Sequence, residues 1–399
     1  MKKIPFFVIA ILVVLLTHSC VEPLELESID YENLLVVESL VTNENKHHTV
    51  KLSRTFKLDS TVIKKETGAL VIVKDDTQNS FTFSEINDGE YLSDNAFFAE
   101  VGKSYTLEIT TNDGTSYKST PEKITAISSI DNVDIKKEIN SDGKESINFY
   151  AVGNNPTNEN LYYRYDYDET FKIVAPYWNK YRLNITDRAF PFAFDVVEDS
   201  EETQKQICYK TQRSTKVILA ETGTFANNNT NQLIRSVQKD NYIISHRYSL
   251  LVKQYVQSVD AYNYFKTLSK LSTSQSLFTQ SQPGQIASNI KSSKSNDNVI
   301  GIFEVSSVST KRVYINFEDY FPNTQIGYGV NCDFISPTIN LGISDVESFL
   351  ILVLDGKQYI YYDDNHNQGD NEGPYDLVTT ACGDCSVLGK SIKPTFWVD

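Results

Sequence analysis

The feature of this sequence that most constrains its fold is a period-two alternation of apolar and polar residues. In the segment 105–110, Tyr, Leu and Ile alternate with Thr, Glu and Thr, and the segments 48–53 and 161–168 follow the same pattern. This alternation is typical of a strand with one buried face. Asp-Gly pairs at 88–89 and 113–114 separate such segments, and this pair is a strong hairpin signal. The chain is therefore expected to be mainly β.

The spacing of these segments suggests how the chain divides into domains. About seven strand-like segments fall within roughly ninety residues, which predicts an immunoglobulin-like or transthyretin-like β-sandwich over residues 33–126. A boundary is expected at 121–127. Residues 127–399 are expected to form a larger β-rich domain with one or two helices and a Cys-containing tail. The abundance of Tyr (24) and Phe (21) beside a single Met also favours strands.

One helix is expected near residues 258–271. Ser258 is a suitable N-cap residue. Apolar residues then recur at helical spacing, with Ala261 beside them, and they are Tyr262, Phe265, Leu268 and Leu271.

Strand patterns resume after a polar stretch that covers residues 272–298. We expect strands at 299–305 and 312–317. Two later apolar segments, 349–354 and 359–362, flank Asp355-Gly356 and are interpreted as a hairpin.

The first nineteen residues are laid out as a secretory signal peptide. Lys2 and Lys3 precede an apolar segment, 4–16, that is too short to be a stable membrane span. Cys20 stands at the expected cleavage point after the small residue Ser19. We interpret residues 1–19 as a lipoprotein signal peptide and Cys20 as the lipidated residue, which would attach the protein to a membrane. The alternative is an ordinary signal peptide with a cysteine nearby.

Residues 20–32 are interpreted as an acidic tether. The residue after Cys20 is Val21, not the Asp that marks inner-membrane retention, so the outer membrane is the expected location. Acidic residues follow closely, as in export signals to the cell surface, although a solvated acidic linker explains them equally well; they are Glu22, Glu25, Glu27 and Asp30.

Four cysteines remain after Cys20, and an even number in an exported chain favours disulfides. They are Cys208, Cys332, Cys382 and Cys385, and three pairings are open. A redox motif at 382–385 is the first alternative, but it lacks the expected helical context. A zinc site is the second, but such sites usually show two close cysteine pairs.

The sequence offers little support for catalysis, metal binding or cofactor binding, and we expect none of them. The acidic segment 363–370 fails the spacing of a helix-loop-helix calcium site. His47 and His48 should point to opposite faces of a strand, so they cannot easily share a metal. The net charge of −15 argues against nucleic acid as a partner. Trp178 and Trp397 could stack on sugar rings, but we expect them to fill sheet faces.

Several patches together resemble an uncharacterised Bacteroidota lipoprotein family, the domain of unknown function 4249. The likeness runs from about residue 21 to the C-terminus, and the closing Cys-x-x-Cys with Lys-Pro-x-Phe-Trp is its most specific part. It implies an outer-membrane lipoprotein, often encoded near TonB-dependent receptors, with no established catalytic residues. The patches are Leu35-Val36-Val37-Glu38-Ser39-Leu40, Gly102-Lys103-Ser104-Tyr105-Thr106-Leu107, Tyr248-Ser249-Leu250-Leu251-Val252-Lys253-Gln254-Tyr255, Val299-Ile300-Gly301-Ile302-Phe303, Cys382-Gly383-Asp384-Cys385 and Lys393-Pro394-Thr395-Phe396-Trp397.

These observations leave two hypotheses of different classes. The first is a non-enzymatic binding or accessory lipoprotein of an outer-membrane barrel, most plausibly a TonB-dependent transporter. The second is a surface hydrolase of glycans or peptides. A purely structural role in the envelope is compatible with the same features.

Overall fold

The computed structural model describes residues 33–56, 63–155, 159–200, 204–224, 229–273, 288–295, 297–324, 327–339, 348–366, 369 and 371–399. The expected signal peptide, the tether and Cys20 lie outside these residues. The described chain is mainly β, as the alternation predicted. A search for a helix long and apolar enough to cross a membrane finds none in the described part.

Fourteen strands of the described chain belong to one continuous sheet. Its hydrogen-bonded order is β14-β11-β17-β19-β1-β2-β6-β5-β4-β7-β8-β18, with β15 beside β11 and β3 beside β2. The strands are β1 (Leu35–Thr42), β2 (Thr49–Arg54), β3 (Lys64–Lys65), β4 (Leu70–Asp75), β5 (Ser80–Asn87), β6 (Glu90–Ser93), β7 (Tyr105–Thr110), β8 (Ser116–Ser119), β11 (Tyr162–Val174), β14 (Ile207–Arg213), β15 (Ile218–Glu221), β17 (Arg247–Gln257), β18 (Ile290–Ser292) and β19 (Val299–Asn316).

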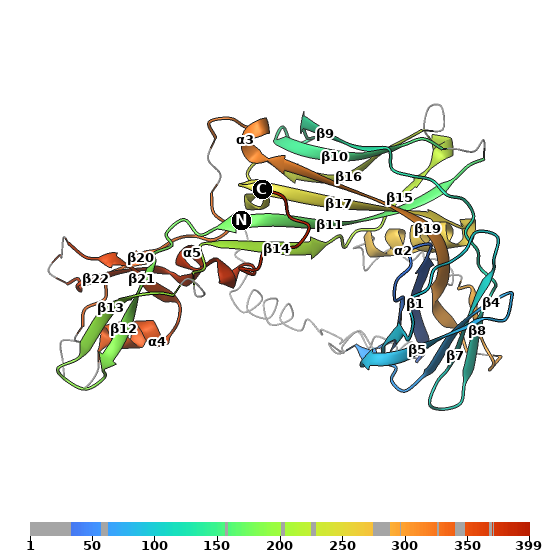
Figure 1. Cartoon of the computed structure of the whole chain (residues 1–399), viewed down its shortest axis with the longest axis horizontal. Helices are drawn as coiled ribbons and strands as arrows, with labels where there is room; N and C mark the ends of the chain where they lie inside the picture. The colour runs from blue at the N-terminus through green and yellow to red at the C-terminus, as the bar shows by residue number, and fades with distance from the viewer. Residues whose placement is uncertain are drawn as a thin grey trace, which may run out of the picture.

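Strand β19 lies in the middle of this sheet and joins its N-terminal strands to β17, β11 and β14. Its first part pairs in parallel with β1, from Leu35 opposite Val299 to Thr42 opposite Ser306. Its second part pairs antiparallel with β17. The two strands predicted at 299–305 and 312–317 are therefore one strand of 18 residues. In Figure 1, β19 runs from the N-terminal strands into the layer that holds β17 and β11.

The N-terminal strands enclose an apolar core, and the period-two pattern of the sequence correctly predicted that alternate residues face it. Every second residue of β1, β4 and β7 faces this core, and their neighbours face outward. The core also takes Ile290, Val299, Phe303 and Val305 from later strands. The boundary near residue 126 remains a prediction. However, the N-terminal part of the large sheet, β1 to β8, which we call the first sheet, is completed by β18 and the first part of β19, far beyond that residue.

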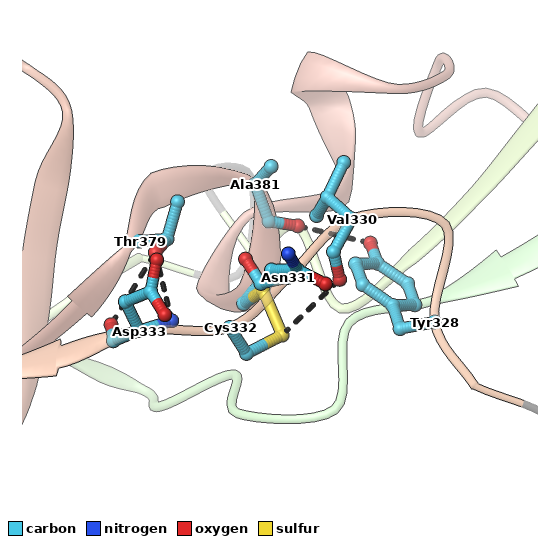
Figure 2. Close-up of a disulfide and its surroundings, with 8 residues drawn as sticks. Tyr328, Val330, Asn331, Cys332, Asp333, Thr379 and Ala381 are labelled. Carbon is cyan, nitrogen blue, oxygen red and sulfur yellow. Dashed lines mark hydrogen bonds between the residues drawn. A yellow bond between two sulfur atoms is a disulfide. The ribbon is translucent and has the colours of Figure 1, made fainter.

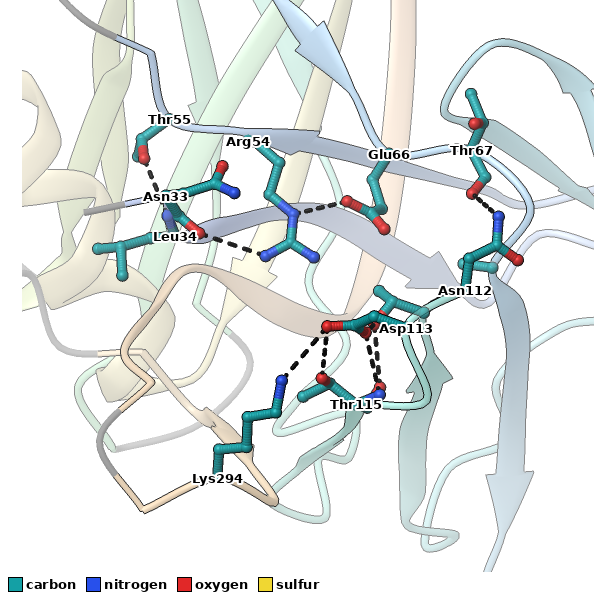
Figure 3. Close-up of polar contacts among 12 residues, drawn as sticks. Asn33, Leu34, Arg54, Thr55, Glu66, Thr67, Asn112, Asp113, Thr115 and Lys294 are labelled. Atoms are coloured by element: carbon teal, nitrogen blue, oxygen red, sulfur yellow. Dashed lines mark hydrogen bonds and ion pairs between the residues drawn. The ribbon is translucent and has the colours of Figure 1, made fainter. Parts of the chain in front are cut away.

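Polar contacts hold the loops of this first sheet together (Figure 3). Asp113, in the predicted Asp-Gly turn, accepts a hydrogen bond from the Thr111 hydroxyl at 2.6 Å and bonds from Thr115. The ammonium of Lys294 lies 3.3 Å from the same carboxylate. The Thr111 and Thr115 bonds and then Lys294 lower the pKa of Asp113 well below its usual range. Gly114 has a φ of +80°, which favours glycine in this turn.

A second core lies between two layers of the larger β-rich part. One layer contains β11, β14, β17 and the second part of β19, and the other is a three-stranded sheet of order β16-β10-β9. Aromatic side chains fill the space between them, and Phe149 lies 5.6 Å from Tyr248 between ring centroids. Figure 1 shows the two layers stacked above one another. The three strands are β9 (Asn132–Ile139), β10 (Glu145–Gly153) and β16 (Thr230–Gln238).

The predicted helix is confirmed as α2, Val259–Thr273. The hydroxyl of Ser258 accepts a hydrogen bond from the backbone N–H of Ala261 at 3.2 Å, which satisfies one of the free donors at the helix start. The ring of Tyr262 packs on Tyr162 of β11, with 4.9 Å between centroids. This contact fixes one face of the helix against the central strands.

A smaller unit extends from the other end of the molecule (Figure 1, left). It combines the hairpin of β12 (Tyr181–Asp187) and β13 (Ala193–Glu198) with a three-stranded sheet of order β20-β22-β21. The strands of this sheet are β20 (Phe334–Ile335), β21 (Tyr359–Asp364) and β22 (Tyr375–Thr379). The remaining elements of the described residues are α3 (Phe317–Tyr320), α4 (Phe349–Asp355), α5 (Thr380–Gly383) and the 3-10 helices Thr222–Thr224, Tyr242–Ile244 and Cys385–Val387.

The hairpin predicted around Asp355-Gly356 is wrong. The segment Phe349–Asp355 is helix α4, and only the second segment is a strand, β21. The hydroxyl of Ser348 caps the helix by accepting from the N–H of Ile351 at 3.3 Å. A short continuous apolar run has no period-two pattern, so its period cannot distinguish a strand from a helical turn.

The expected disulfides are present, and all four cysteines take part. Cys208 of β14 pairs with Cys385, and Cys332 pairs with Cys382. The two cysteines of the Cys-x-x-Cys motif therefore bind different partners, which is not the pairing of a redox motif. Figure 2 shows that the second bridge lies beside the bond from the Tyr328 hydroxyl to the carbonyl of Ala381, 2.9 Å long. The Cys208–Cys385 bridge ties the end of the smaller unit to β14 of the large sheet, whereas Cys332–Cys382 joins two neighbouring segments next to β20 and β22 within the unit.

The two disulfides give a prediction about peptide mapping and stability. Digestion without reductant should release two linked peptide pairs, one with Cys208 and Cys385 and one with Cys332 and Cys382. The paired cysteines are 177 residues apart in Cys208–Cys385 and 50 residues apart in Cys332–Cys382. From loop-closure entropy, replacing the first pair by Ala should lower the free energy of unfolding by about 5 kcal/mol, and replacing the second pair should lower it by about 4 kcal/mol. Mass spectrometry and urea denaturation measure both effects, and a Cys382–Cys385 linked peptide would contradict the pairing.

His48 is buried in the first core and does not face its neighbour His47. Its Nε2 lies 2.9 Å from the carbonyl oxygen of Phe97, while Nδ1 of His47 lies 2.6 Å from that of Ser93. Burial lowers the pKa of His48 to about 4. The ring is therefore neutral in the folded protein at pH 7.

This lowered pKa predicts acid sensitivity. The unfolded chain takes up a proton near pH 6.5 and the folded chain only near pH 4. The free energy of unfolding should therefore fall as the pH drops through this window, by about 3 kcal/mol in total. The variant His48→Gln should lose that part of the pH dependence in urea denaturation at several pH values. His47→Gln is the matched control and should keep it. Identical profiles for all three proteins would contradict the prediction.

Candidate functional site

A groove of about 570 Å³ lies between helix α2 and the first sheet, and we call it the junction groove. This volume is in the range of sites for small ligands. The groove is half open to solvent, so a ligand could enter without unfolding the protein. Its walls come from five elements that are far apart in the sequence, namely β1, β2, β11, α2 and β19.

The floor of the groove is the outward face of β1 and β19. In the parallel register, Val36 lies opposite Ile300, Glu38 opposite Ile302 and Leu40 opposite Glu304. Because side chains alternate along a strand, these residues point away from the core that contains Leu35 and Val37. The floor is therefore apolar near Val36 and Ile300 and becomes charged toward Glu304.

Close backbone approach at Gly301 permits the pairing of β19 with β1 beneath the groove. Gly301 has a φ of +121°, and a Cβ at this position would lie 2.0 Å from the carbonyl oxygen of Val37. A larger residue would therefore collide with β1 and disturb the parallel pairing.

The opposite wall is a half-buried face of α2. Tyr264, Phe265 and Leu268 line it. Their spacing places them on neighbouring positions of one helical face, which lies beside the face that carries Tyr262. Burial and the nearby charge of Glu38 raise the pKa of Tyr264, so its hydroxyl keeps its proton at neutral pH.

Arg164 of β11 closes the charged end of the groove. Its Nη1 lies 2.8 Å from Asp166 and its Nη2 lies 3.2 Å from Glu304. The guanidinium also packs on two aromatic rings. Its central carbon Cζ lies 4.4 Å from the ring centroid of Tyr255 and 4.7 Å from that of Phe265. Only 8% of Arg164 is exposed, so these contacts are made largely out of water.

The carboxylate of Glu304 is held on both oxygens. Oε2 faces Arg164, while Oε1 accepts hydrogen bonds from the Gln257 amide at 3.2 Å and the Ser306 hydroxyl at 2.6 Å. Burial alone would lower the pKa of Arg164, but the charges of Glu304 and Asp166 outweigh it and raise that pKa. Arg164 therefore stays protonated at neutral pH.

The network keeps some donor capacity. The buried Nε of Arg164 and the Oε1 of Gln257 have no hydrogen-bond partner within the described residues. A guanidinium has five N–H groups, and the two ion-pair contacts occupy only part of them. Arg164 lines the groove, so its remaining N–H groups are donors for a ligand at this end.

The residues singled out from the sequence do not meet at this groove. The four cysteines lie at and near the smaller unit, and Cys20 lies outside the described residues. Trp397 packs between Tyr209 and Tyr314, at 5.0 and 6.2 Å between centroids, so it fills a surface layer as expected. Sequence reasoning missed Arg164 and Glu304.

A metal centre is not visible in the part of the chain that the structure describes. There, no three or more His, Cys, Asp or Glu side chains are grouped so that they could hold an ion. The acidic segment 363–370 is described only in part, and the carboxylate of Asp364 accepts a hydrogen bond from the Tyr361 hydroxyl at 2.9 Å.

The fold and the groove together define a mainly β protein with a groove of ligand size between helix α2 and the outward face of β1 and β19. Comparison with family models matches residues 21–312 to "Domain of unknown function (DUF4249)". The chain belongs to this family, as the sequence patches indicated. The closing Cys-x-x-Cys and Lys-Pro-x-Phe-Trp motifs lie beyond the matched residues.

Two other comparisons add little. No curated protein matches the chain. Among solved structures, a DUF4785 family protein from Legionella pneumophila is similar at 8% sequence identity and a TM-score of 0.19, over 56% of this chain and 52% of that one. The chain thus spans about half the length of that structure.

The Arg164–Glu304 pair yields a prediction about stability. Arg164→Met should lower the free energy of unfolding by about 3 kcal/mol, because Glu304 is then buried without its counter-charge. Combining it with Glu304→Leu should restore most of this loss, because no buried charge remains. Urea denaturation at pH 7 measures both changes.

A matched control is Arg182→Met, which removes an exposed arginine 3.1 Å from Asp199. It should change stability by at most about 0.5 kcal/mol, as surface ion pairs contribute little. If the double variant were as unstable as Arg164→Met, the loss would have to come from packing and not from the unpaired charge.

Proposed function

We propose that the protein is an outer-membrane lipoprotein, attached through Cys20, that binds a ligand in the junction groove. We further propose that it acts as an accessory subunit of an outer-membrane barrel of the TonB-dependent transporter class. The groove carries this proposal, because it joins apolar walls to a charged end in a volume suited to a ligand.

The chemistry of the groove favours binding over hydrolysis. Hydrolysis of a glycan needs two carboxylates that can act on one bond. The groove has Glu38 and Glu304, but both oxygens of Glu304 are already occupied by Arg164, Gln257 and Ser306. A carboxylate held in this way serves to position Arg164 better than to move protons.

The attachment and the barrel partner rest on the sequence. Residues 1–20 have the layout of a lipoprotein signal peptide with its cysteine. Membership in the DUF4249 family is consistent with this reading. A tethered binding protein beside a transporter would raise the local concentration of its ligand at the barrel entrance.

The proposal predicts the result of a pull-down from native membranes. After extraction in mild detergent, the tagged protein should carry a TonB-dependent barrel in near-equal amount, as identified by mass spectrometry. The Cys20→Ser variant should leave the membrane fraction and lose the barrel, because tethering keeps the two proteins together. Recovery of the wild-type protein alone, across several detergents, would contradict the accessory role. Membrane retention of Cys20→Ser would contradict the attachment.

A further inference from the structure

We propose that the junction groove binds a single acyl chain that carries an uncharged carbonyl group, as in a monoacylglycerol or another neutral acyl ester. This inference rests on the ligand-binding role proposed above and names the class of ligand. The groove has a polarity gradient along its length, and each end selects a different part of such a molecule.

The apolar end selects the chain. Val36 and Ile300 form the floor there, Ile302 continues it, and Leu268 of α2 lies on the wall. In this sheet, side chains that face the other way already form a complete core, so these residues are not needed to close it. Contact with a ligand would remove their apolar surface from water. An unbranched acyl chain fits this apolar lining between the helix and the sheet.

The charged end selects a hydrogen-bond acceptor. Arg164 is buried beneath Phe265 and has N–H groups beyond those that Asp166 and Glu304 occupy. The carboxylate of Glu304 accepts its own bonds from Gln257 and Ser306, so it is not available as the main acceptor for a ligand donor. A carbonyl oxygen is the matching group.

The balance of charge favours an uncharged head group. The ionised side chains that line the groove are Lys51 and Arg164, which are positive, and Glu38 and Glu304, which are negative. Glu38 lies opposite Lys51 in the pairing of β1 with β2, and Glu304 faces Arg164. Asp166 adds a further carboxylate beside Arg164, and Glu90 lies 3.6 Å from Lys51, so a carboxylate or phosphate head finds no net positive field.

Calorimetric titration of the mature chain with Cys20→Ser tests this assignment. The substitution keeps acyl groups attached to Cys20 out of the experiment. The probes are monoacylglycerols of about six to about twelve carbons, used below their micelle concentrations, and affinity should rise about fourfold for each added methylene until the groove is filled. Alkyl glycerol ethers of equal length lack the carbonyl and should bind about tenfold more weakly. Fatty acids above their pKa should also bind more weakly than the esters.

Two variants locate the binding. Leu268→Asp places a charge on the apolar wall and should weaken binding at least about tenfold. Asn263→Asp adds the same charge to an exposed position of α2 and should leave the affinity unchanged. Leu268→Trp fills the groove, so the affinity should level off at a shorter chain. Circular dichroism and thermal unfolding confirm that each variant is folded.

Each result decides for or against the ligand class. An affinity that is independent of chain length, or equal in Leu268→Asp and Asn263→Asp, would overturn it. Binding of hydrophobic tripeptides without binding of monoacylglycerols would make the groove a peptide site and would also overturn it. A barrel recovered in the pull-down together with absent acyl binding would leave the accessory role standing and remove only this inference.

Discussion

The parallel pairing of β19 with β1 is the constraint on which the remaining structure depends. It completes the first sheet, and the same strand then continues into the antiparallel pairing with β17. The change of partner occurs close to Ser306, just after Glu304. At this point the buried carboxylate of Glu304 needs a counter-charge. Arg164 of β11, two strands away in the same sheet, supplies it. The groove follows from that contact, since Arg164 and α2 are brought over the outward face of β1.

The charged pair at this position is better understood as a device for specificity than as a source of stability. Two desolvated charges rarely contribute more than well-packed apolar side chains would. The pair does exclude other registers of β19, because a shift of this strand by one residue would turn Glu304 toward the apolar core. The rings of Tyr255 and Phe265 on either side of Arg164 extend the same constraint to β17 and α2. The register of the sheet and the position of the helix are thus set together.

Local patterns in the sequence were enough for the fold class, but not for the site. Alternation identified β7, the Asp-Gly pair identified the turn at Gly114, and Ser258 identified the start of α2. The strand prediction for the segment 349–354 was wrong, because its continuous run of apolar residues has no period that distinguishes strand from helix. Ser348 caps this segment as the start of a helix. The groove could not be predicted, since its residues meet only through long-range pairing. A signal was nonetheless present: Arg164 and Glu304 interrupt stretches of otherwise buried strand residues, where an ionised side chain requires a partner.

The position of β19 also has a consequence for how the chain must be made. Val37 emerges early in synthesis, whereas its pairing partner Gly301 follows only after most of the chain. Until then, one edge of β1 has unsatisfied backbone groups beside an apolar core, and such an edge readily joins strands of other molecules. Contacts between distant parts of a chain also form slowly. During this interval a chaperone that holds the new chain would protect it from aggregation. The interval ends when β19, the last strand of the large sheet in chain order, pairs with β1.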